Sequence, residues 1–128
     1  MSRILIAEDD PHILRVISLW LSRQGHEVIE ARNGLVALEL FSEHEPEILV
    51  TDVNMPGMDG LALLERLPKD GYRPAGIVVL TNRWDHRELH DRISAERDNV
   101  HVVPKPFSPN ALATLIDELL GVKPASTN

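Results

Sequence analysis

Ile48-Leu49-Val50-Thr51-Asp52 is the stretch of sequence that decides the fold. A mostly apolar run of strand length that ends on a carboxylate is typical of a β-strand covered on both faces, as in a parallel sheet. Two further runs have the same character, Ile4-Leu5-Ile6-Ala7 and Ile77-Val78-Val79-Leu80. We therefore predict that these three segments are central strands. Val28-Ile29 and residues 100–103 are weaker runs, which suit the edges of the sheet.

Amphipathic stretches separate these strands, and apolar residues recur in them at helical spacing. The recurring residues are Ile13, Leu14, Ile17 and Leu21, then Ala37, Leu38 and Phe41, then Leu61, Leu64 and Leu67, and finally Leu112, Leu115, Ile116 and Leu119. Asn33 is a candidate cap of the second helix, and Ser108-Pro109 is a cap and first-turn pair for the last. Residues 84–96 are mainly charged, with only Leu89 and Ile93 at helical spacing, and predict a marginal, exposed fourth helix.

Five predicted strands thus alternate with five predicted helices. Because crossover connections are right-handed, this order favours an α/β fold with a doubly wound parallel sheet. We expect that sheet to be flavodoxin-like, with strand order 2-1-3-4-5. The length of 128 residues fits one domain. We expect that domain to cover residues 1–120, with residues 121–128 as a flexible tail or the start of a linker.

Composition excludes several classes of function. The net charge of −7 should repel a nucleic-acid backbone, so we expect no direct DNA binding. No apolar run approaches the roughly 20 residues of a membrane span, and Met1-Ser2-Arg3 resembles no secretory leader, which favours a cytoplasmic location. The lack of cysteine removes disulfides, thiolate zinc sites and cysteine nucleophiles from consideration.

Acidic, hydroxyl and basic side chains follow the predicted strands, at the edge where doubly wound sheets bind ligands. The chain places Asp9 and Asp10 after the first strand, Asp52 at the end of the third, Thr81 after the fourth and Lys105 after the fifth. Three carboxylates in one crevice repel each other and demand protonation or a cation. A hard, oxygen-preferring ion such as Mg²⁺ meets that demand. We therefore predict a Mg²⁺ site at Asp9, Asp10 and Asp52.

The same residues predict phosphoryl chemistry. The backbone carbonyl of Asn54 is a candidate further ligand of the metal. With charge offset by a metal, Asp52 can attack phosphorus and form an aspartyl phosphate. Lys105 offers a cation and Thr81 a hydroxyl to the phosphoryl oxygens. Each residue taken alone is more simply a turn, a cap or a solvated side chain, and the interpretation depends on their coincidence at four strand ends.

Three motifs resemble the receiver domains of bacterial response regulators, from Arg3 to about Leu120. Thr51-Asp52-Val53-Asn54-Met55-Pro56-Gly57-Met58-Asp59-Gly60 is similar to the phosphoacceptor strand and the turn beyond it. Ile4-Leu5-Ile6-Ala7-Glu8-Asp9-Asp10 resembles the first strand and acidic pair, and Lys105-Pro106-Phe107 resembles the lysine turn. The resemblance also implies a cis bond after the lysine, which proline favours.

The resemblance implies a function in two-component signalling. Asp52 would receive phosphate from a sensor histidine kinase or phosphotransfer protein, with Asp9 and Asp10 serving Mg²⁺ and with Lys105 and Thr81 reading the phosphoryl group. The domain would catalyse this transfer and its own slow dephosphorylation, without an independent metabolic substrate. A face made by the fourth helix, fifth strand and fifth helix would bind a downstream effector protein.

Departures from the family lie on the output side. Val102 stands where the family usually has Tyr or Phe, Asn82 follows the switch threonine in place of a small residue, and Glu96-Arg97-Asp98-Asn99 replaces a Gly-Ala turn. His101 or Trp84 are candidates to substitute for the aromatic. The alternative to a phosphorylated switch is therefore a pseudo-receiver, which binds proteins without phosphate. A small phosphatase is disfavoured, because no second carboxylate stands two residues after the acceptor to act as a general acid.

Overall fold

The computed structural model describes residues 2–55, 57–68, 71–81, 99–105 and 107–121. The strands are β1 (Arg3–Ala7), β2 (Glu27–Ala31), β3 (Ile48–Asp52), β4 (Gly76–Thr81) and β5 (Val100–Pro104). The described helices are α1 (Pro11–Arg23), α2 (Gly34–His44), α3 (Gly60–Arg66) and α5 (Pro109–Leu120). The predicted fourth helix at 84–96 and the tail 122–128 lie outside the described residues. None of the described helices is long and apolar enough to cross a membrane.

The five strands form one parallel sheet in the order β2-β1-β3-β4-β5, which confirms the predicted strand order. The weak runs are the two edge strands, and the strongly apolar runs are the three central ones. Register pairs Ala7 with Thr51, and Thr51 with Val79. All strand ends therefore come to one edge of the sheet, where the polar side chains follow.

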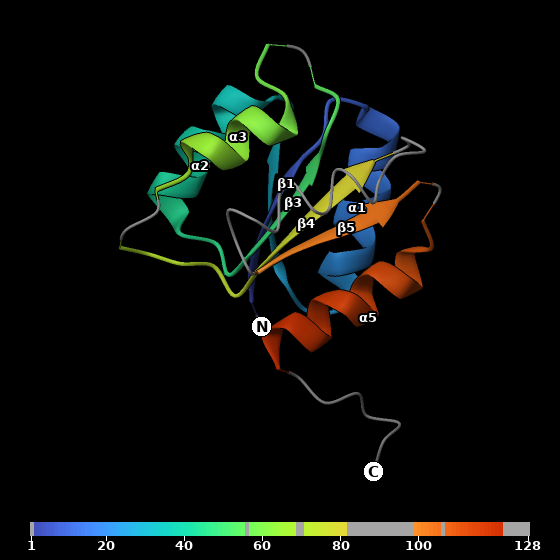
Figure 1. Cartoon of the computed structure of the whole chain (residues 1–128). Coiled ribbons are helices and arrows are strands. Elements are labelled where there is room, and N and C mark those ends of the chain that lie inside the picture. The colour runs from blue at the N-terminus through green and yellow to red at the C-terminus, as the bar shows by residue number, and fades with distance from the viewer. Residues whose placement is uncertain (1, 56, 69–70, 82–98, 106, 122–128) are drawn as a thin grey trace.

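Helices cover both faces of the sheet: α2 and α3 lie on one face, and α1 and α5 on the other (Figure 1). Successive residues of a strand point to opposite faces. Leu5 and Leu49 accordingly belong to the apolar cluster under α2 and α3, whereas Ile4 and Ile48 belong to the cluster under α1 and α5. Because both faces are covered, the central strands have no solvent-exposed side, which is why their sequences are continuous apolar runs.

Capping residues set where the helices begin, as the sequence predicted for α2 and α5. The Asn33 side chain accepts a hydrogen bond from the backbone N–H of Val36 at 2.9 Å, and the Ser108 hydroxyl accepts one from Ala111 at 3.3 Å. Asp59 caps α3 in the same way. Asp59 also lines an open hollow together with Asp9, so the first turn of α3 lies near an acidic residue that follows β1.

Candidate functional site

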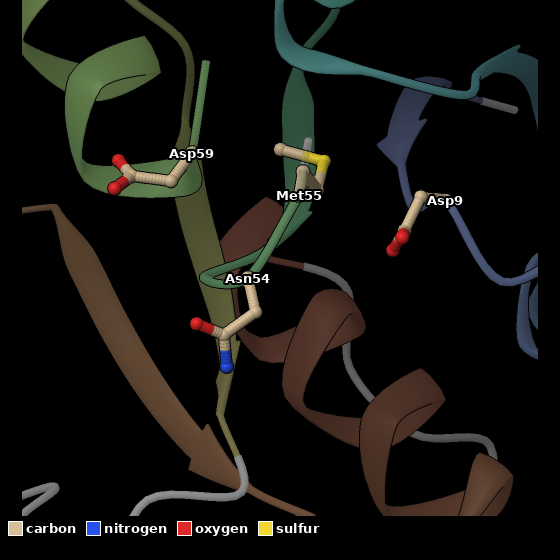
Figure 2. A pocket seen from close by; sticks show the side chains of 4 residues that line it. All are labelled: Asp9, Asn54, Met55 and Asp59. Carbon is tan, nitrogen blue, oxygen red and sulfur yellow. The ribbon is translucent and has the colours of Figure 1, made fainter. Parts of the chain in front are cut away.

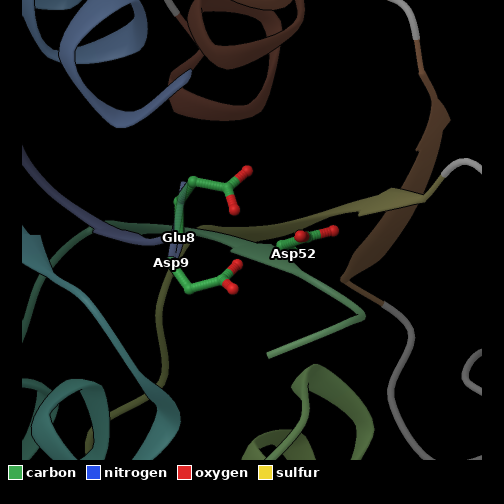
Figure 3. Close-up of side chains that lie close together, drawn as sticks. All are labelled: Glu8, Asp9 and Asp52. Atoms are coloured by element: carbon green, nitrogen blue, oxygen red, sulfur yellow. The ribbon is translucent and has the colours of Figure 1, made fainter. Parts of the chain in front are cut away.

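Three carboxylates meet at the carboxyl edge of the sheet. Glu8 and Asp9 follow β1 and Asp52 ends β3, and one oxygen of each lies within 4.8 Å of the others (Figure 3). Glu8 and Asp52 are buried, being 1% and 6% exposed, while Asp9 is open to solvent. The cluster therefore has a buried side and a side that a ligand can approach.

Asp10, which was predicted as a metal ligand, caps helix α1 in the structure. Its side chain accepts hydrogen bonds from the backbone N–H groups of His12, at 2.9 Å, and Ile13, at 3.4 Å, so it is the N-cap of α1. Glu8, and not the predicted Asp10, is the third carboxylate of the cluster with Asp9 and Asp52. The signal that could have separated them is Asp10-Pro11, a cap followed by a first-turn proline, which is the pattern used above for the last helix.

Lys105 lies against the buried side of this cluster. Its Nζ is 3.2 Å from Glu8 Oε1 and 3.3 Å from Asp52 Oδ2. Its backbone N–H donates to the carbonyl of Thr81 at 2.6 Å, so the end of β4 is tied to the lysine turn. Thr81 itself is fully buried. The structure thus brings together Asp52, Lys105 and the end of β4, as the strand-end rule predicted.

The electrostatics of the site reflect this crowding. Burial and the negative charge of Asp52 raise the pKa of Glu8 to about 7, although Lys105 and the N–H of Asp10 oppose the shift. Burial disfavours the Lys105 ammonium, but the Asp52 and Glu8 carboxylates outweigh burial and raise the pKa of Lys105. The raised pKa of Glu8, beside a lysine that contacts both Glu8 and Asp52, indicates that the site carries more negative charge than one lysine neutralises.

An open hollow of about 390 Å³ adjoins the exposed side of the cluster, lined by Asp9, Asn54, Met55 and Asp59. Figure 2 shows Asn54 and Met55 on the segment after β3, between Asp9 and the start of α3. The donors at the cluster are hard carboxylate oxygens, which suit Mg²⁺ rather than a thiophilic metal. Asn54 lies at the hollow, and a role for its backbone carbonyl stays a prediction.

Several predictions concern residues outside the described ranges, namely Asn82, Trp84 and Pro106. Val102 is described: it lies in β5, pairs in register with Val79 and packs against the apolar cluster under α2 and α3. His101 pairs with Val78 and is half-buried. The position at which receiver domains usually have Tyr or Phe therefore carries a partly buried valine.

The fold and the site together define a doubly wound α/β domain with an acidic, lysine-containing centre at its strand ends. A sequence model of the response regulator receiver domain matches residues 4–117. The chain therefore belongs to the response regulator receiver domain family, as its motifs predicted.

Proteins similar to the chain include a chemotaxis protein, a transcriptional regulator and a domain of a histidine kinase. It is 32% identical over 122 residues to a chemotaxis protein CheY homologue of Campylobacter jejuni, covering 93% of this chain and 92% of that protein. It is 34% identical over 107 residues to the transcriptional regulatory protein KdpE of Mycobacterium tuberculosis, covering 84% of this chain but 46% of KdpE. It also resembles the solved receiver domain of a signal transduction histidine kinase from Syntrophus aciditrophicus, with 30% identity, a TM-score of 0.81 and coverage of 100% and 97%. The chain thus spans about half the length of KdpE.

Proposed function

We propose that this receiver domain takes a phosphoryl group on Asp52 from a histidine kinase or phosphotransfer protein, in a Mg²⁺-dependent reaction. The observation that carries the proposal is the position of Asp52, which is buried within 4.8 Å of two other carboxylates and 3.3 Å from Lys105. A surface aspartate has no such surroundings. The arrangement suits a nucleophile whose charge must be offset before it can approach a phosphate.

The side chains divide the chemistry between them. An Asp52 carboxylate oxygen attacks phosphorus, and the bond from phosphorus to the donor's leaving group breaks, with its electron pair leaving on the donor. Glu8 and Asp9, with Asp52, would hold Mg²⁺, which offsets negative charge on the incoming phosphoryl group. Lys105 offers its ammonium to a phosphoryl oxygen, and Thr81 its hydroxyl. Slow hydrolysis of the acyl phosphate would reset the domain.

The phosphoryl group would act by favouring one of two arrangements of a protein-binding face. We place this face on β5 and α5, together with the predicted fourth helix, which lies outside the described residues. The effector is a protein, and the net charge of −7 argues against direct contact with nucleic acid. We also propose a cytoplasmic location, and a domain that ends with α5, where Gly121 adopts a left-handed cap with φ 76°.

A pseudo-receiver is the second candidate function. It is favoured by Val102, which is partly buried against the apolar cluster and leaves no aromatic at that position of β5 to couple Thr81 to the output face. A pseudo-receiver would bind its partner equally well with and without phosphate.

Incubation with Mg²⁺ and a small acyl phosphate tests the proposal. Intact mass should rise by one phosphoryl group in Mg²⁺, and should stay unchanged when a chelator replaces the metal, because the crowded carboxylates then repel the phosphodonor. A chain that gains no mass under either condition contradicts the proposal and favours the pseudo-receiver.

A further inference from the structure

Among the described residues, the large apolar side chains that are exposed to solvent lie on two helices. Val16 and Leu19 of α1 are 50% and 49% exposed, and Leu35 and Val36 of α2 are 56% and 38% exposed. Single apolar residues scattered over a surface are normal, but these four form two neighbouring pairs. Each pair therefore marks a helix face that is available to a partner.

The two helices carry opposite charge around these pairs. α1 contains Arg15 and Arg23 and no acidic residue, whereas α2 contains Glu39 and Glu43 and no lysine or arginine. All four charged side chains are exposed. Of the described helices, α1 alone has arginine without any acidic residue, although the whole chain carries a net charge of −7. The face of α1 thus suits an acidic and apolar surface, which is what α2 presents.

The spacing of the two faces also matches. On α1, Arg23 follows Leu19 by one helical turn, and on α2 Glu39 and Glu43 follow Val36 by about one turn and two turns. When the apolar pairs of the two parallel helices are placed level, Arg23 lies level with a point midway between Glu39 and Glu43. At a rise of about 1.5 Å per residue, each glutamate is then roughly 3 Å from Arg23 along the axis. The long arginine side chain can reach both.

α1 and α2 are oriented so that two copies of the domain can make this contact without rotation. The helices lie on opposite faces of the sheet (Figure 1). Because β1, β2 and β3 are parallel, both helices return the chain to the same edge of the sheet and run in the same direction. One copy stacked on another therefore sets α1 of the first parallel to α2 of the second.

We propose that this domain binds a second copy of itself through a head-to-tail contact between α1 and α2. The apolar pairs make the centre of the contact, and Arg23 pairs with Glu39 and Glu43 at its rim. The contact joins different surfaces of the two copies, so each copy keeps one of these faces open to a further copy. Such a contact builds an open chain unless a rotation closes it into a ring.

This contact forms against the net negative charge of each copy. At about 0.15 M salt the Debye length is roughly 8 Å, so charges far from the contact are largely screened. Exposed ion pairs contribute little, and burial of the apolar pairs contributes more. The interface is therefore small and weak, with a dissociation constant on the order of 1 mM.

An exchange of charges between the two helices tests the contact. Arg23→Glu should weaken association about tenfold, because the new carboxylate faces the two glutamates of the next copy. A second variant, Glu39→Arg with Glu43→Arg, should weaken it as much, because its arginines face Arg23. An equimolar mixture of the two variants should associate again. In the mixture the altered helix of each variant meets the altered helix of the other, and their unaltered helices pair as in the wild type.

Sedimentation equilibrium at about 1 mM chain and about 0.15 M salt measures the weight-average mass. The wild type and the mixture should exceed the monomer mass of 14.4 kDa at least about 1.5-fold, and each variant alone should stay near it. Glu65→Arg and Arg66→Glu, at exposed positions of α3, are the matched controls for net charge. Both controls should associate like the wild type.

Leu19→Gln and Leu35→Gln test the apolar centre without a change of charge, and each should lower the mass toward that of the monomer. Urea unfolding checks that every variant is folded. A monomeric wild type would overturn the proposal and leave these faces to a different partner. A mixture that stays monomeric, or wild-type association of the Glu39→Arg and Glu43→Arg variant alone, would also overturn it. None of these outcomes bears on phosphorylation of Asp52.

Discussion

Asp52→Asn should take up no detectable phosphoryl group from a small acyl phosphate in Mg²⁺, under conditions in which the wild type is fully modified. An amide has no anionic oxygen to attack phosphorus, and it also removes one of three clustered carboxylates. The shape of the side chain is nearly unchanged, so the loss should not reflect misfolding. Intact mass measures the adduct, and urea unfolding checks the fold.

Asp59→Asn is the matched control for this variant. Asp59 lines the same hollow, but it is exposed, and its side chain caps α3 through the N–H of Ala62. Asparagine is as good a cap as aspartate, so stability should be retained. Asp59→Asn should be phosphorylated like the wild type. An adduct on Asp52→Asn at the wild-type level would mean that the phosphoryl group goes elsewhere.

Gly60→Ala should have the largest effect on stability, a loss of roughly 2–3 kcal/mol in the free energy of unfolding. A Cβ on Gly60 would lie 2.3 Å from the carbonyl oxygen of Asp52 and 3.1 Å from Cα of Val53. These are backbone atoms of the strand end and cannot move as a flexible side chain does. Relief of the clash must shift Asp52, so the fraction that folds should also be phosphorylated more slowly. Urea denaturation and intact mass measure the two effects.

Gly57→Asn is the control for Gly60→Ala. Nothing lies within 4 Å of a Cβ at Gly57, and asparagine tolerates its left-handed φ of 79° better than other side chains. The loss of stability should therefore be smaller than for Gly60→Ala. Equal stability of Gly60→Ala and the wild type would contradict the close approach of α3 to the end of β3.

The sheet could be predicted from sequence because its central strands are buried on both faces. That burial demands continuous apolar runs such as Ile4 to Ala7, and these runs also mark which strands are central. The caps of α2 and α5 could be predicted because Asn33 and Ser108 act on residues only three positions away. Local chemistry of this kind is visible in a sequence.

The details of the site depend on long-range geometry. The rule for strand ends was enough to bring Asp52 and Lys105 to one edge. It could not tell which two of the three consecutive acids after β1 point into the site, although Asp10-Pro11 could have marked Asp10 as the cap of α1. The hydrogen bond between Glu8 and Lys105 joins residues that are 97 positions apart in the sequence, and no local sequence pattern predicts it.

The proposed phosphorylation of Asp52 can be checked by locating the phosphoryl group on the wild-type chain. Reduction with borohydride converts an acyl phosphate to an alcohol, and peptide fragmentation then identifies the modified residue. We expect modification at Asp52 alone, and only when Mg²⁺ is present. Modification of another residue, or equal modification of Asp52 in the presence of a chelator, would contradict it.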